Sequence, residues 1–296
     1  MIVRVADDQA GLRLDHLLAE PLGSRSRAQR LIDDGRVTVD GAVRPKRHRV
    51  SAGETIEVDD APPPAAAGQA AADVDVPIAY EDDALLVVDK PPGLVVHPAA
   101  GNWTGTLAQA LEARGIAAER GGLVHRLDRD TSGLLLAAKD DVTLRALQAE
   151  LRARRIEREY LALVEGRPPA RTGTIDAPIG RDRRDRTRHS TDTDTPRDAV
   201  THFEIAEALP RTTLLRVRLE TGRTHQIRVH LQAIGHPVVG DPEYGPRPPR
   251  ETLGLQRQFL HAARLAFDHP DDGRRVEVSS PLPPDLAAAL ERAGLH

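Results

Sequence analysis

The sequence contains no cysteine among its 296 residues. Disulfide bonds, thiolate-bound zinc and cysteine nucleophiles are therefore excluded, and only histidines and carboxylates remain as possible metal ligands. The chain also lacks an apolar segment near Met1 and any hydrophobic run of membrane-spanning length, so we expect a soluble, cytoplasmic protein that does not act at a membrane. Glycine-rich phosphate loops and dinucleotide fingerprints are missing as well, so no small-molecule cofactor is expected.

A strong charge of one sign is also lacking, since the formal net charge is -4. This value argues against a uniformly basic coat for nucleic acid, but the charges are segregated. Residues 21–50 carry eight Lys or Arg against three acids, residues 211–230 five Arg against Glu220, and residues 152–158 four Arg against Glu157. Each island alone could be a solvated helix face. Together they favour a track that binds phosphates.

A stretch rich in alanine and proline divides the chain. Residues 61–75, APPPAAAGQAAADVD, have no hydrophobic period that could contribute to a core. With 40% hydrophobic residues, the chain can build one large core and a small second one. We therefore predict a small domain at residues 1–60, a linker at 61–76 and a large domain at 77–296.

The small domain has the pattern of two helices and a small sheet. Leu14, Leu17 and Leu18 have helical spacing, and a second helix is expected from Ser24 until Gly35. Two short alternating segments, RVTVDGAVR and GETIEVDD, follow as strands, the first with a hairpin turn at Asp-Gly.

This small domain resembles the alpha-L RNA-binding motif, an S4-like domain, over residues 12–58. The resemblance is carried by RLDHLL, SRSRAQRLIDDGRVTVDG and the Gly-Glu turn that follows. It implies that the second helix presents its cations to RNA phosphates, where the helix N-terminus adds a favourable dipole. The implied RNA contacts are Arg25, Arg27, Arg30 and Lys46.

The large domain alternates strands and helices. A buried strand is expected at Ala84–Asp89, and helices at residues 104–114 and 141–155. The Arg-rich segment at residues 181–196 has no apolar period and is expected to be a mobile surface loop.

The segment VHRLDRDTSG, residues 124–133, is the most informative one. A carboxylate between arginines at the edge of a core, here Asp128, can be kept ionised and oriented, as a nucleophile or a base requires. Taken by itself, the tetrapeptide HRLD is more often a salt-bridged turn than a catalytic centre. In the alternating strand REYLALVEG, Tyr160 beside Arg158 could stack on a base or be an ordinary half-buried tyrosine.

A helix is expected in the segment RTHQIRVHLQAIG, with Thr224 as its N-cap and Arg228 off its apolar stripe. The histidines of this region could suggest a metal site. Their spacing disfavours it, and no carboxylate accompanies them in the sequence, so we expect no metal. These histidines are His225, His230 and His236.

Four strings in this order resemble the RluA-type family of pseudouridine synthases, from about Pro77 to Phe267. They are LLVVDKPPGLVVHPA, VHRLDRDTSGLLLAAK, REYLALVEG and TGRTHQIRVHLQAIGHPVVGDPEYG. The resemblance implies an α+β fold in which a mixed, largely antiparallel central sheet carries flanking helices and a cleft. It also implies isomerisation of uridine to pseudouridine in structured RNA.

By the same resemblance, Asp128 is the nucleophile and Arg228 is the basic partner that pairs with it. Tyr160 stacks on the uracil and takes the proton from ring carbon five, and Arg126 fills the gap left when the uridine flips out of its stack. Whether Asp128 attacks the ribose or the uracil ring stays open.

The resemblance favours large-subunit (23S) ribosomal RNA as the substrate of a monomeric enzyme. Two alternatives are a synthase acting on transfer RNA and a non-catalytic RNA-binding factor of ribosome assembly. A carboxylate glycosidase is disfavoured, because Asp130 lies too close to Asp128 in the sequence to span a sugar cleft.

Overall fold

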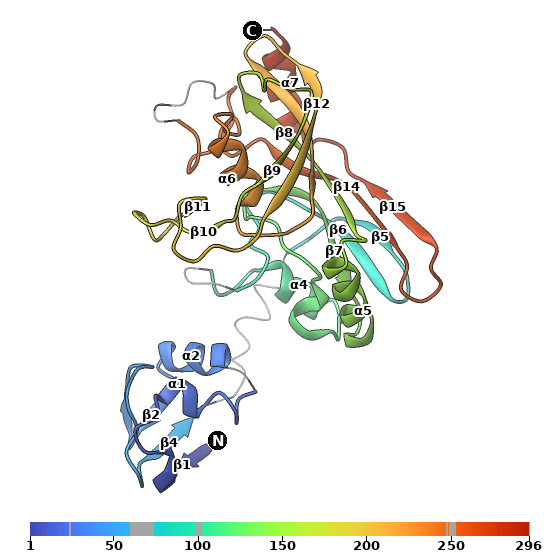
Figure 1. Cartoon of the computed structure of the whole chain (residues 1–296). Helices are drawn as coiled ribbons and strands as arrows, with labels where there is room; N and C mark the ends of the chain where they lie inside the picture. Colours follow the sequence, from blue (N-terminus) through green and yellow to red (C-terminus); the bar gives the residue numbers. More distant parts are fainter. Residues whose placement is uncertain (24, 60–73, 99–101, 247, 249–252, 296) are drawn as a thin grey trace. The chain divides into compact units, whose positions relative to one another are not determined.

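The computed structural model describes residues 1–23, 25–59, 74–98, 102–246, 248 and 253–295. The chain separates into two units, Met1–Pro64 and Ala65–His296 (Figure 1). The linker predicted at residues 61–76 lies largely outside the described residues, so the domain boundaries stay a prediction. Within the described residues, no helix combines the length and apolar character needed to cross a bilayer.

The N-terminal unit contains two helices and a four-stranded sheet, as the sequence predicts. The sheet has the order β1 (Ile2–Arg4), β4 (Thr55–Val58), β2 (Val37–Val39), β3 (Ala42–Val43), and the helices are α1 (Leu14–Leu17) and α2 (Arg25–Asp33). The turn between β2 and β3 has positive φ angles at Asp40 (47°) and Gly41 (75°), which a two-residue hairpin turn requires. Ala28, Leu31 and Ile32 of α2 are buried in a separate small core.

The second unit is built on one large sheet of nine strands. Only β14 and β7 pair in parallel, and the other pairs among the described strands are antiparallel. This confirms the predicted α+β fold with a mixed, largely antiparallel sheet. The spatial order is β5 (Ile78–Glu81), β6 (Leu85–Lys90), β7 (Ser132–Ala138), β14 (Leu260–Asp268), β8 (Glu157–Glu165), β13 (Thr212–Leu219), β12 (Val200–Ala208), β9 (Thr172–Asp176), with β15 (Arg275–Ser279) pairing with β14.

The parallel pair fixes the position of the segment that precedes β7. Gly133 has a φ of 107°, and a Cβ there would lie 2.3 Å from the carbonyl oxygen of Ala262 on β14. Only glycine combines this φ with so close an approach. The chain therefore enters β7 at a defined place, separated by three residues from the end of the HRLD tetrapeptide.

Helices flank the sheet at two places. In Figure 1, α5 lies beside β7, and α6 lies beside β12. All seven residues of β7 are buried, so its hydrophobic run lies in the main core. The helices and the 3-10 turn of this unit are α4 (Leu107–Ala113), η2 (Glu119–Gly122), α5 (Asp141–Arg152), α6 (Gln226–Ala233) and α7 (Pro284–Leu295).

The segment predicted as a mobile surface loop, residues 181–196, lies mostly at the surface, and its mobility stays a prediction. Short strands β10 (Gly180–Arg181) and β11 (His189–Ser190) pair there as a two-stranded sheet. The backbone N–H of His189 donates to the Tyr244 hydroxyl at 3.2 Å. The pairing of β10 with β11 and the hydrogen bond to Tyr244 hold this segment in place. A sequence without an apolar period does not reveal such contacts.

Candidate active site

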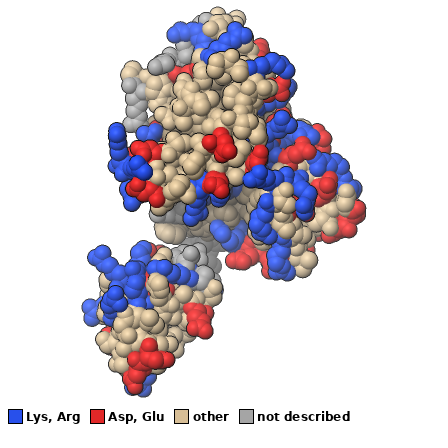
Figure 2. Space-filling model, viewed as in Figure 1, with Lys and Arg blue, Asp and Glu red and all other residues tan. Residues whose placement is uncertain are grey.

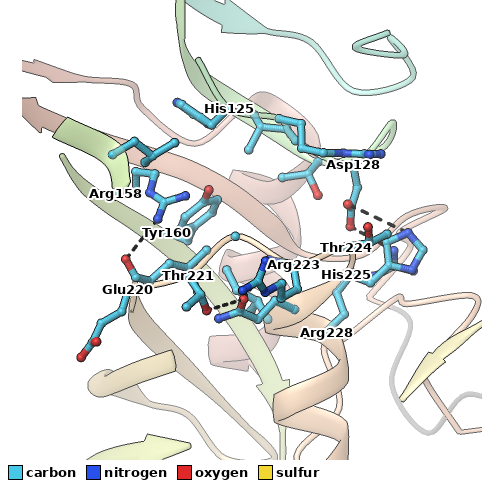
Figure 3. Close-up of a pocket in the computed structure, with 18 of the residues that line it drawn as sticks. His125, Asp128, Arg158, Tyr160, Glu220, Thr221, Arg223, Thr224, His225 and Arg228 are labelled. Carbon is cyan, nitrogen blue, oxygen red and sulfur yellow. Dashed lines mark hydrogen bonds and ion pairs between the residues drawn. The ribbon is translucent and has the colours of Figure 1, made fainter. Parts of the chain in front are cut away.

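A cleft of about 510 Å³ opens where three segments meet. They are the segment before β7, strand β8 and the connection from β13 into α6 (Figure 3). The four residues that the sequence analysis assigned to catalysis and base flipping all line this cleft, although they come from distant parts of the chain. They are Arg126, Asp128, Tyr160 and Arg228.

The backbone around Asp128 is held by two buried cations. The carbonyl oxygen of Arg129 accepts a hydrogen bond from Lys90 Nζ at 2.8 Å, and that of Asp130 accepts one from Arg257 Nη1 at 3.0 Å. Lys90 is fully buried, and this burial lowers its pKa to about 7. These hydrogen bonds fix the backbone that follows Asp128.

Arg228 joins Asp128 to a second, deeper carboxylate. Its Nη1 lies 3.1 Å from Asp128 Oδ2, while Nε and Nη2 donate to the two oxygens of Asp241 at 2.7 and 2.9 Å. Burial alone would lower the pKa of Arg228, but the hydrogen bonds and charges of Asp241 and Asp128 outweigh it and raise this pKa. The arginine therefore stays charged, and it holds a carboxylate that is 17% exposed to the cleft.

His225 approaches the other oxygen of Asp128. Its Nε2 lies 4.0 Å from Asp128 Oδ1, and its Nδ1 lies 2.9 Å from the Tyr244 hydroxyl and 3.4 Å from Glu243 Oε2. The expectation that no carboxylate accompanies the histidines is thus wrong for His225. His225, in a left-handed conformation with φ of 56°, and not Thr224, is the N-cap residue of α6.

Within the described residues, no group of three or more histidines and carboxylates is arranged to hold a metal ion. His230 and His236 instead accept or donate hydrogen bonds inside the fold. His230 contacts Thr201 Oγ1 and the Ala177 carbonyl, each at 2.8 Å, and His236 contacts the Glu165 carbonyl at 2.9 Å.

Tyr160 forms part of the cleft wall across from Asp128 (Figure 3). It lies in the middle of β8, between Val217 of β13 and Ala262 of β14, and is only 4% exposed. Burial raises the pKa of its phenol, the charge of Arg158 opposes this, and Asp128 adds to it. The side chain is therefore a neutral phenol at physiological pH, and it lines the cleft.

Arg126 is exposed at the cleft, and its role in base flipping stays a prediction. In the N-terminal unit, basic side chains gather at the end that carries α2 (Figure 2). Arg25 there donates to the buried Asp15 at 2.9 Å, and Lys46 pairs with Asp33 at 2.7 Å. Both also remain partly exposed. Arg27 is exposed on α2, and the side chain of Arg30 lies outside the described part of the structure.

Sequence reasoning missed the residues that support the nucleophile candidate. Asp241 and Glu243 belong to the string GDPEYG that carried the family resemblance, but nothing in their spacing connects them to Arg228. Lys90 directly follows the strand expected at Ala84–Asp89, and the sequence analysis assigned it no role. The available signal was a lysine at the end of a largely apolar strand, followed by two prolines. Lysine is almost never fully buried unless it has partners, so a buried Lys90 indicates a specific role.

Comparisons with known proteins agree with this geometry. Residues 84–233 match the family described as RNA pseudouridylate synthase, and residues 12–56 match the S4 domain. The chain is 46% identical to ribosomal large subunit pseudouridine synthase D of Pseudomonas aeruginosa, over 97% of this chain and 94% of that protein. It is 44% identical to an RNA pseudouridine synthase of Bacillus subtilis, over 98% and 96%. The solved structure of human RNA pseudouridylate synthase domain containing 1 superimposes with a TM-score of 0.60 at 30% identity, over 73% of this chain and 87% of that one.

Proposed function

The chain belongs to the RNA pseudouridylate synthase family, and from this premise we propose that it isomerises uridines of large-subunit ribosomal RNA with Asp128 as the nucleophile. It is a pseudouridine synthase, as its family and its relatives' names agree. The observation that carries the proposal is the contact between Asp128 and Arg228, at 3.1 Å, inside a cleft that also holds Tyr160.

The proposed reaction needs one carboxylate, one stacking surface and one proton acceptor. A uridine flips out of the RNA into the cleft, with Arg126 filling the gap, and Asp128 engages the nucleotide while Arg228 keeps the carboxylate ionised and directed. The bond from ribose to N1 breaks, and a new bond forms from ribose to C5. Tyr160 stacks on the uracil throughout, and its hydroxyl relays the proton that C5 loses, giving up its own proton to water as it accepts the other, while N1 gains a proton in exchange.

The substrate proposal rests on the relatives and on the N-terminal unit. Relatives that are 44–46% identical over nearly the whole chain are named for the large ribosomal subunit. An RNA-binding domain at residues 1–60, with Arg25, Arg27, Arg30 and Lys46 as phosphate contacts, would dock the enzyme on structured RNA. The catalytic domain would be residues 77–296, acting as a monomer in the cytoplasm, where ribosomal RNA is available.

Pseudouridine mapping with a carbodiimide tests this proposal. Ribosomal RNA and transfer RNA are compared from cells that contain the protein, cells that lack it, and cells that carry the Asp128→Asn variant. We expect sites in large-subunit RNA to disappear without the protein and to return only with the unchanged chain. Loss confined to transfer RNA would reject the substrate, and sites restored by Asp128→Asn would reject the nucleophile.

A further inference from the structure

Arg158 is a buried cation in the cleft that has no carboxylate partner among the described residues. Its side chain is only 7% exposed. Nη2 donates to the carbonyl oxygen of Leu219 at a long 3.4 Å, and Nε is buried without any hydrogen-bond partner. The ion pairs formed within the described part of the chain include none to Arg158.

A buried guanidinium without a counter-charge destabilises the folded protein unless another group neutralises it. Burying an unpaired charge disfavours the folded state by several kcal/mol, on the order of the cost found for other buried ions. Two other arginines that line the cleft avoid this cost, Arg228 because it is paired and Arg154 because its side chain is 56% exposed. Arg228 is as deeply buried but is paired with Asp128 and Asp241, and Arg154 is paired with Glu220. Of these three arginines, Arg158 is the one that is buried without a carboxylate partner among the described residues, so its position suits an anion.

The surroundings of Arg158 leave room for such an anion. A Cβ at Gly222 would lie 3.1 Å from Arg158 Nη1, so the glycine keeps this nitrogen uncrowded. Two exposed arginines, Arg152 and Arg223, line the same cleft. Arg223 uses Nε for the carbonyl of Asp198 at 2.9 Å, and neither arginine forms a carboxylate pair within the described residues.

We propose that Arg158, in a cleft that Arg152 and Arg223 also line, binds a phosphate of the RNA strand whose uridine occupies the cleft. A guanidinium presents two parallel N–H groups that match the oxygens of a phosphate. These three arginines line the cleft without a carboxylate partner among the described residues, and they suit a full negative charge better than the neutral carbonyls of uracil. This site rests on the proposed function, because the strand enters the cleft only when an RNA substrate is bound.

The position of Arg158 gives the site a place in the reaction. Arg158 and Tyr160 lie two residues apart on β8 and side by side on the cleft wall, with Asp128 across from them (Figure 3). A phosphate fixed by Arg158 would hold the strand next to the base that stacks on Tyr160. The subsite would thereby position the substrate and would take no part in bond breaking.

The test measures the salt dependence of RNA binding by the full-length chain. A fluorescent, single-stranded oligouridylate is titrated with the unchanged protein and with Arg158→Met and Arg158→Gln, at several potassium chloride concentrations. Gln retains a donor for the Leu219 carbonyl and removes only the charge. Arg145→Met is the matched control, because Arg145 is exposed on α5 and does not line the cleft.

Loss of one phosphate contact makes the plot of log affinity against log salt shallower by about 0.7 for a single strand. We expect this change in both Arg158 variants, with affinity at low salt weakened about tenfold. Thermal melts should show equal or higher stability, because an unpaired buried charge has been removed. The control should keep the slope and affinity of the unchanged protein.

Three outcomes would overturn the proposal. Weaker binding with an unchanged slope would assign Arg158 to a neutral part of the nucleotide, such as the uracil carbonyls. Unchanged binding with a lower melting temperature would make Arg158 a structural residue. Unchanged binding with unchanged stability would leave Arg158 without a ligand. The pseudouridine map reports separately on the proposed function, so failure of one is not confused with failure of the other.

Discussion

Asp128 and Arg228 are 100 residues apart in the sequence, yet Oδ2 of the first lies 3.1 Å from Nη1 of the second. Only Nη1 of the guanidinium reaches Asp128, because Nε and Nη2 are engaged by Asp241. The arginine is thus anchored on its buried side and directed on its cleft side. Substitutions at the two carboxylates should separate chemistry from stability.

Asp128→Asn should lower turnover by at least about a thousandfold, because an amide cannot act as the nucleophile. Arg228 keeps its bidentate partner Asp241, so the melting temperature should change little. Pseudouridine formation on a transcript of the mapped RNA region and filter binding of the same RNA give the two readouts. RNA affinity should survive, and a variant with normal turnover would remove Asp128 from the mechanism.

Asp241→Asn should destabilise the fold by about 3 kcal/mol, because Arg228 loses its buried counter-charge. Turnover should fall as well, since Asp128 then faces an arginine that is no longer anchored. Glu243→Gln is the matched control: Glu243 lies 3.4 Å from Arg228 and is 28% exposed, so it should cost less than about 1 kcal/mol. Urea unfolding measures both, and equal effects of the two substitutions would contradict this division of roles.

Tyr160→Phe should slow turnover by about a hundredfold, because the hydroxyl that receives the proton is lost. The ring remains, so stacking on the base, worth about 1–3 kcal/mol, is retained and RNA affinity should change little. Steady-state kinetics therefore should show a drop in kcat at a nearly constant KM. Parallel losses in kcat and RNA affinity would show that the hydroxyl serves binding instead.

The fold should lose stability as the pH falls below 6.5. Burial, helped by the charge of Arg158, lowers the pKa of His125 from 6.5 to about 3. Between these values the unfolded chain binds a proton at this histidine and the folded chain does not, so the free energy of unfolding decreases with decreasing pH. His97, with a pKa lowered by burial to about 4, acts in the same direction over a narrower range.

His125→Asn removes one of these two titrating groups and should make the decline in unfolding free energy less steep. Urea unfolding at a series of pH values between 4 and 7 measures it. Asn keeps an acceptor for the backbone N–H of Leu136, which donates to His125 Nε2 at 3.3 Å. An unchanged pH dependence in this variant would mean that His125 is already charged in the folded protein.

The sequence by itself determined the elements whose signals are local. The apolar stripe of α2, the Asp40–Gly41 hairpin and the alternation of β8 all follow from neighbours within a few residues, and all three are present in the structure. The contiguous strings around Asp128, Tyr160 and Arg228 likewise indicated the family, because each string is short and ordered along the chain.

Only the tertiary structure decided how these strings combine. Arg228 and Asp128 are surrounded by Asp241, Glu243 and His225. These three residues lie in turns that have no hydrophobic period, so no pattern in the sequence predicts their contacts. The same holds for Arg158, whose lack of a counter-charge depends on what lies opposite it. Charges on side chains interact through space, and the distances that set those interactions exist only after the sheet has brought its strands together.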